Sequence, residues 1–134
     1  MPLVLGNLKR LELLRSNPSL KDKLWSNAKK LQAGLRKKGF DIGKTDSVVT
    51  PIYMTGDVPE ATAMVMDLRE NYGIFCSIVV YPVIPKGHII YRLIPTAVHN
   101  DEDIEATLAA FEATKKKLDQ GDYKVEAIPD MAEA

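Results

Sequence analysis

One arginine stands inside an apolar stretch of this sequence, and its chemistry is that of an anion-binding group. Arg92 lies in the run YRLIPTAVH, residues 91–99. Side chains of an extended strand alternate between two faces, so Arg92 would share its face with Ile90 and Ile94. A guanidinium there either pairs with an acidic group of the same chain or uses its parallel N–H donors to bind a ligand carboxylate. The spacing leaves both interpretations open.

The other reactive residue types predict no catalytic centre. Cys76 is the single cysteine, and with two histidines, His88 and His99, it makes no cluster with metal-ligand spacing. We expect Cys76 to pack within a strand, His88 to be exposed and His99 to serve the turn before a helix. The sequence has no phosphate-binding glycine loop and no nucleophile elbow. We therefore predict no metal site and no redox chemistry.

Length and composition are those of one ordinary globular domain. The chain has 134 residues, of which 46% are hydrophobic and 27% charged. Its apolar runs are much shorter than the roughly 20 residues that span a bilayer, and its start lacks a signal-peptide pattern. We expect no transmembrane segment and a cytoplasmic location.

Charge is unevenly distributed along the chain although the net charge is zero. Residues 1–40 hold ten Lys or Arg against two Asp or Glu, and residues 41–134 hold eight against sixteen. A basic helical half could bind nucleic acid. However, the basic residues surround a leucine stripe as on a solvated helix face, and no aromatic residues alternate with them to stack on bases. We predict no nucleic-acid binding.

Hydrophobic periodicity and turn residues predict seven elements. In chain order these are helices over about 3–15 and 18–38, a strand over 47–54, a helix over 58–72, strands over 74–81 and 89–95, and a helix over 101–120. The predicted helix caps are Asn17, Asp57 and Asn100 at N-termini and Gly39, Gly73 and Gly121 at C-termini. Pro51 cannot donate a ladder hydrogen bond, which favours an edge strand or a bulge.

This order predicts an α+β fold, in which a small antiparallel or mixed three-stranded sheet is covered by helices on one face and preceded by a long helical segment. We expect a single domain over residues 1–121, with 1–40 as the helical lead-in and 46–121 as sheet and helices, and a loosely held tail over 122–134. The expected buried side chains are Leu20, Leu24, Trp25, Ala28, Leu31, Leu35, Met64, Met66, Leu68, Ile104, Leu108, Phe111 and Leu118.

The run GIFCSIVVYPVIPKGHIIYRLIPTAVHNDEDIEATLAAFE resembles the C-terminal domain of the α-oxoamine synthases, pyridoxal-phosphate enzymes of the class I/II aminotransferase superfamily. The motif residues are Tyr81-Pro82, Ile84-Pro85, Gly87, Arg92-Leu93, Thr96-Ala97 and His99. Upstream, LKDKLWSNAKKLQAGLRKKGFDIGKTDSVVTPIYM is also similar, so the resemblance spans about residues 8–119. Cys76, Val79 and Val83 are its weaker positions.

The resemblance implies decarboxylative condensation of an amino acid, serine or glycine, with an acyl-coenzyme A thioester. Family members include serine palmitoyltransferase, glycine C-acetyltransferase and 8-amino-7-oxononanoate synthase, and their active sites form between two subunits, so it also implies a homodimer. Arg92 falls on the family arginine that binds the amino-acid carboxylate. The loop with Tyr81, Val83 and Lys86 would line the site near the acyl donor.

The resemblance also implies that part of the machinery lies elsewhere. In the superfamily, the Schiff-base lysine, the aspartate on the pyridine nitrogen and the residue stacked on the ring belong to a large domain that this sequence lacks. We therefore expect no catalytic residue in this chain, no pyridoxal phosphate bound to it alone and no turnover by it alone, and MPLVLGNLKR resembles the interior of a longer polypeptide. The alternative is a free-standing small-molecule-binding or dimerisation module.

Overall fold

The computed structural model describes residues 2–124 and contains four helices and three strands. They are α1 (Pro2–Ser16), α2 (Pro18–Lys37), β1 (Thr50–Thr55), α3 (Val58–Tyr72), β2 (Ser77–Val79), β3 (His88–Leu93) and α4 (Asp101–Gln120). The strands form one antiparallel sheet in the order β1-β3-β2. The predicted α+β class is confirmed, and of the two predicted kinds of sheet the antiparallel one is observed. The expected tail from residue 125 onward lies outside the described residues.

The ends of α3 and α4 are set by local chemistry that the sequence shows. Asp57 and Asn100 each accept a hydrogen bond from the backbone N–H three residues on, and the acidic side chain at that later position accepts one from the cap's own N–H. Each of these capping boxes satisfies two donors that a helix start leaves unpaired. Gly73 and Gly121 end the helices with φ of 67° and 84°, a conformation that glycine adopts without strain.

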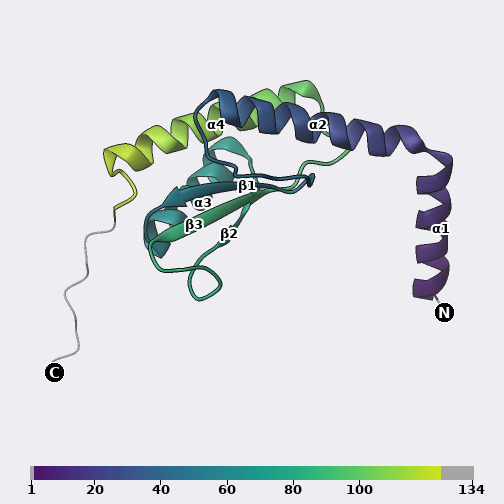
Figure 1. The fold of residues 1–134 in the computed structure, drawn as a ribbon, viewed down its shortest axis with the longest axis horizontal. Coiled ribbons are helices and arrows are strands. Elements are labelled where there is room, and N and C mark those ends of the chain that lie inside the picture. Colours follow the sequence, from purple (N-terminus) through teal and green to yellow (C-terminus); the bar gives the residue numbers. More distant parts are fainter. Residues whose placement is uncertain (1, 125–134) are drawn as a thin grey trace.

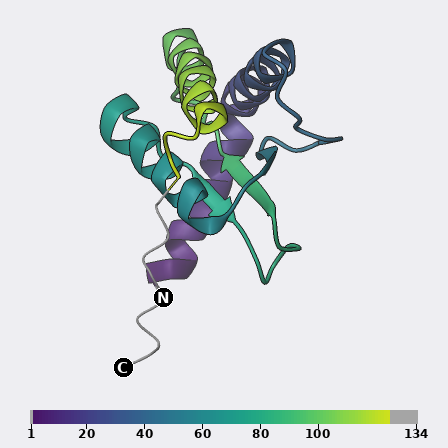
Figure 2. The ribbon, with the colours of Figure 1, turned by 90° about the vertical axis from the view of Figure 1, so that its left-hand side faces the viewer.

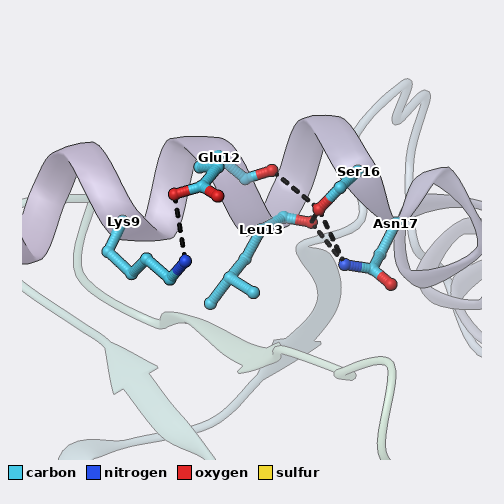
Figure 3. Close-up of polar contacts among 5 residues, drawn as sticks. All are labelled: Lys9, Glu12, Leu13, Ser16 and Asn17. Atoms are coloured by element: carbon cyan, nitrogen blue, oxygen red, sulfur yellow. Dashed lines mark hydrogen bonds and ion pairs between the residues drawn. The ribbon is translucent and has the colours of Figure 1, made fainter.

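The junction of α1 and α2 differs from its expected capping (Figure 3). Asn17 occupies the N-cap position of α2, but its side chain makes no cap hydrogen bond. Its amide instead donates to the Leu13 carbonyl at 2.8 Å, and the Ser16 hydroxyl donates to the Glu12 carbonyl at 2.9 Å. A Lys9–Glu12 ion pair at 3.0 Å lies one turn earlier. Asn17 therefore closes the end of α1 and leaves the start of α2 without a side-chain cap.

Helix α1 stands away from the rest of the fold (Figures 1 and 2) and buries none of its residues. Its exposed large apolar side chains are Leu3, Val4, Leu5, Leu8, Leu11, Leu13 and Leu14. The leucine repeat at helical spacing was sufficient to predict the helix. Its apolar side chains have no covering partner within residues 2–124.

The core lies between one face of the sheet and helices α2, α3 and α4, which run over that face (Figures 1 and 2). From the sheet it contains Ile52, Ile89, Tyr91 and Leu93, and from the helices Leu31, Leu35, Ala61, Met64, Leu68, Ile104, Leu108, Ala110 and Phe111. The Phe111 ring meets the rings of Phe40 and Tyr91 edge to face, with centroids 6.1 and 6.3 Å apart. This aromatic group joins α4 to the central strand.

Several sequence expectations about packing and strand length are wrong. Leu20 and Met66 are 44% and 48% exposed, although both were expected in the core. Met66 lies on the side of α3 that faces away from the buried Met64 and Leu68, and Leu20 lies near the start of α2, before its buried stretch. Strand β2 is only three residues long: Cys76, expected within the strand, is buried just before it, and the chain leaves the ladder at residue 80 and enters a turn. Pro51 lies in the edge strand β1, as expected.

Among residues 2–124, none of the helices combines the length and apolar character required to cross a bilayer.

Candidate functional site

Arg92 lies in the central strand, on the face of the sheet that the helices leave open. Ile89, Tyr91 and Leu93 are buried, whereas Arg92 is exposed and Ile90 half-buried. The alternation follows from the two-residue period of a strand. The expected sharing of a face by Ile90 and Arg92 is thus confirmed by their burial.

The guanidinium of Arg92 has one hydrogen-bond partner in the described part of the chain. Its Nε–H donates to the Ser77 hydroxyl oxygen at 3.1 Å. Ser77 is the register partner of Arg92 on β2, and Pro51 is its partner on β1. No carboxylate between residues 2 and 124 forms an ion pair with Arg92. The internal ion pair that the sequence left open is therefore not found in this part of the chain.

The loop between β2 and β3 carries the other expected site residues. Tyr81 and Val83 are 55% and 78% exposed, and the Lys86 ammonium lies 5.1 Å from the centroid of the Tyr81 ring. This is a cation–π contact. The loop joins β3 at His88, four residues before Arg92, which corresponds to about 13 Å along a strand. The structure thus brings Tyr81 and Lys86 together but separates them from Arg92 along the strand.

The segment that follows β3 is fixed by a side chain from α2. Asn27 is completely buried, and its amide donates to the backbone carbonyls of Thr96 and His99, both at 2.9 Å. The His99 ring accepts a hydrogen bond from the Thr96 N–H through Nδ1, at 3.1 Å. His99 therefore stabilises the turn before α4, as its position in the sequence indicated.

The turn before α4 borders a hollow of about 470 Å³. Its lining residues are Leu31, Tyr72, Gly73, Ile74, Phe75, Leu93, Ile94, Pro95, Thr96, His99, Asp103, Ile104, Ala106 and Thr107. The lining is mainly apolar and includes no lysine or arginine. Because pyridoxal-phosphate enzymes hold the cofactor through a lysine amine, these residues do not make a cofactor site by themselves.

Two buried groups on the helix-covered side of the sheet have raised pKa values. Burial raises the pKa of the Cys76 thiol to about 11. Burial also raises the pKa of Tyr91, with smaller contributions from Cys76 and Glu60. The Tyr91 hydroxyl has no hydrogen-bond partner within the described residues. Both groups are neutral near pH 7.

A polar cluster around Asp67 joins the end of α4 to α3. The Asp67 carboxylate accepts hydrogen bonds from Lys117 at 2.7 Å, from Asn71 at 2.6 Å and from the Tyr123 hydroxyl. Burial by itself would raise the pKa of Asp67, but these hydrogen bonds and the Lys117 charge outweigh it and lower the pKa. The cluster lies on the covered side of the sheet, away from Arg92, and its contacts account for all its charged groups.

Ser77 and Asn27 were not identified from the sequence as site residues. Ser77 pairs with Arg92 only through the strand register, which the long β2–β3 loop does not specify. Asn27 carried a usable signal, since it stands on the apolar stripe of α2, three residues after Leu24 and four before Leu31. A polar residue at such a position is buried and needs a hydrogen-bond partner.

Comparison by sequence finds relatives with named activities. No family model matches the chain. It is 58% identical over 121 residues to cysteate-C-fatty acyltransferase of Capnocytophaga ochracea, covering 90% of this chain and 29% of that protein. It is 36% identical over 115 residues to 8-amino-7-oxononanoate synthase of Thermoanaerobacter pseudethanolicus, covering 86% and 29%.

Comparison by structure gives the same result for the fold. Serine palmitoyltransferase of Sphingomonas wittichii superposes with a TM-score of 0.66 at 28% identity, over 75% of this chain and 25% of that one. For 8-amino-7-oxononanoate synthase of Francisella tularensis the TM-score is 0.69 at 20% identity, a likeness of fold alone, over 83% and 32%. The chain thus spans less than a third of the length of the relatives it matches. In sequence and in fold it matches the C-terminal part of a pyridoxal-phosphate-dependent α-oxoamine synthase.

Proposed function

We propose that this chain is the C-terminal domain of a pyridoxal-phosphate-dependent acyltransferase that condenses an amino acid with a fatty acyl-coenzyme A thioester, with loss of carbon dioxide. The observation that carries the proposal is the 58% identity to cysteate-C-fatty acyltransferase, which extends over nine-tenths of the chain. Cysteate is therefore the first amino acid to test. Serine and glycine follow, because serine palmitoyltransferase is a structural relative at lower identity.

In this proposal Arg92 binds the carboxylate of the amino acid. Its support is the exposed guanidinium on an open, partly apolar sheet face, without an acidic partner in residues 2–124. The planar fork of N–H groups matches the two oxygens of a carboxylate, and an apolar surrounding strengthens such a pair. Tyr81, Val83 and Lys86 line the approach of the acyl donor. Lys86 would then contact an anionic part of that donor.

The cofactor, when bound, withdraws electrons from the amino-acid α-carbon. Its lysine, and the other groups that hold it, are proposed to lie in the part of the enzyme that this sequence does not contain. In this division of roles residues 1–121 form the domain that binds and orients the amino acid, and residues 122–134 form its tail. The whole enzyme is proposed to be a homodimer, and this chain alone to bind no cofactor and to be inactive.

The test is a kinetic comparison in the full-length enzyme. Release of coenzyme A from palmitoyl-coenzyme A is measured with cysteate, serine and glycine, for the wild type, Arg92→Ala and Arg92→Lys. Arg92→Ala is expected to raise KM for the amino acid by about 10- to 100-fold, the worth of a charge-assisted hydrogen-bonded pair. KM for palmitoyl-coenzyme A should stay unchanged. Arg36→Ala, which removes an exposed arginine of α2, is the matched control.

An unchanged amino-acid KM in Arg92→Ala would remove Arg92 from the binding site. A lysine adduct of pyridoxal phosphate on this isolated chain, detected by mass spectrometry after borohydride reduction, would contradict the proposed division of roles.

The exposed apolar side chains of α1 favour a second candidate, a dimerisation module. This candidate predicts that residues 1–134 alone form a stable dimer at micromolar concentration, and that Leu8→Lys with Leu11→Lys on α1 makes them monomeric. Sedimentation equilibrium distinguishes the two states. A monomeric wild-type chain would contradict it.

A further inference from the structure

The two strands on either side of Arg92 offer its side chain different chemistry. Arg92 is paired in register with Pro51 on β1 and with Ser77 on β2. Directly opposed residues of an antiparallel pair project from the same face, so all three side chains share the open face. Proline has no polar side-chain atom, whereas the Ser77 hydroxyl oxygen lies 3.1 Å from Arg92 Nε and accepts its hydrogen bond. The guanidinium is therefore held by a hydrogen bond on the side that faces β2 and has no polar side-chain partner on β1.

This hydrogen bond limits how an anion can approach the guanidinium. An arginine can bind a carboxylate side-on, through Nε–H and one Nη–H, or end-on, through one N–H of each terminal nitrogen. The Ser77 oxygen already occupies Nε–H, so the side-on arrangement is blocked while this bond lasts. No acceptor within residues 2–124 hydrogen-bonds to the Nη groups of Arg92. The end-on arrangement is the one that remains.

We propose that Ser77 is a positioning residue that holds the Arg92 guanidinium by its Nε–H and thereby presents the two Nη groups, end-on, to the carboxylate of the amino acid. The inference rests on the proposed role of Arg92. To that role it adds the end-on geometry of carboxylate binding and a second residue, Ser77. An arginine side chain has several rotatable bonds, so a fixed orientation lowers the conformational entropy that is lost on binding.

The hydrogen bond itself can be tested in this chain without any substrate. In ¹⁵N-labelled protein the Arg92 Nε–H should exchange with water more slowly than the Nε–H of the exposed Arg36, by at least about threefold. Ser77→Ala should abolish this protection, and Ser77→Thr, which keeps a hydroxyl, should retain it. Ser19→Ala, in the first turn of α2, is the matched control and should leave it unchanged. Equal exchange in wild type and Ser77→Ala would overturn the proposal.

The positioning role is tested in the full-length enzyme with cysteate and palmitoyl-coenzyme A. Ser77→Ala should raise KM for cysteate by about 3- to 10-fold, with KM for palmitoyl-coenzyme A unchanged and Ser77→Thr close to wild type. Because Ser77 acts through Arg92, Ser77→Ala should have no further effect in the Arg92→Ala background.

The two proposals fail in different ways. If Arg92→Ala raises KM for cysteate and Ser77→Ala does not, the positioning role of Ser77 is wrong and the role of Arg92 stands. If Ser77→Ala acts equally strongly with and without Arg92, Ser77 contacts the substrate by itself and the positioning role is again wrong. If Arg92→Ala leaves KM for cysteate unchanged, both proposals fall.

Discussion

Removal of the Asn27 side chain should destabilise the fold, because Asn27 is the link between α2 and the turn after β3. Its amide makes two buried hydrogen bonds at 2.9 Å, to the carbonyls of Thr96 and His99. Each is worth about 1 kcal/mol, and a small unfilled cavity adds about 1 kcal/mol. The side-chain carbonyl oxygen of Asn27 is buried and has no hydrogen-bond partner among the described residues. Because Asn27→Ala also removes this unfavourably buried oxygen, part of the cost is offset. For Asn27→Ala we expect a loss of about 2 to 3 kcal/mol in the free energy of unfolding.

Urea unfolding followed by circular dichroism measures this loss, provided that the slope of free energy against urea stays unchanged. Asn27→Asp keeps the volume but has no donor and buries a charge, so it should destabilise more than Asn27→Ala. Asn7→Ala, at an exposed asparagine of α1, is the control and should change the free energy by less than about 0.5 kcal/mol. If both Asn27 variants also fall within about 0.5 kcal/mol of wild type, the reasoning is refuted, because the two hydrogen bonds then contribute nothing.

Three further predictions concern single residues. Asn100→Ala should destabilise by about 1 kcal/mol in urea unfolding, because Asn100 caps the start of α4; Asn17→Ala should cost less, because the Asn17 side chain does not cap α2 and bonds instead to Leu13 at the end of the exposed helix α1, and equal losses would contradict this. The lowered pKa of Asp67 means that its carboxylate stabilises the fold above the unfolded pKa of about 4 and that this contribution is lost as the pH falls below it. Acid unfolding of Asp67→Asn should therefore depend less steeply on pH than that of wild type, and an unchanged profile would show that the Lys117 and Asp67 pair is irrelevant to stability. Cys76, with its pKa raised to about 11 by burial, should react with a maleimide at pH 8 far more slowly in the native chain than in urea, and equal rates would refute its burial.

Local signals in the sequence predicted the fold well. The start of α3 could be predicted because the two residues of its capping box, Asp57 and Glu60, lie within one turn of each other. The face of the sheet on which Arg92 lies follows from strand alternation alone. The partner of Arg92 could not be predicted, because Ser77 reaches it through a register that no tight turn specifies. Likewise, α2 periodicity places Asn27 on the buried side but does not say which backbone groups, some 70 residues later, will lie opposite it. Exposure of α1 was equally unpredictable, since a leucine repeat indicates a helix without identifying what covers it.

The sheet order β1-β3-β2 has a consequence for how the chain folds. Strands β1 and β3 pair from Thr50 opposite Leu93 to Thr55 opposite His88, with α3 and β2 between them in the chain. Closing a loop of this length costs about 3 kcal/mol of chain entropy before any pairing compensates for it, whereas the loop over residues 80–87 that joins β2 to β3 is shorter and costs less to close. The β2–β3 hairpin and the capped helices can therefore form early, and β1 joins late. A substitution that weakens the pairing of β1 with β3 should therefore raise the unfolding rate and leave the refolding rate nearly the same.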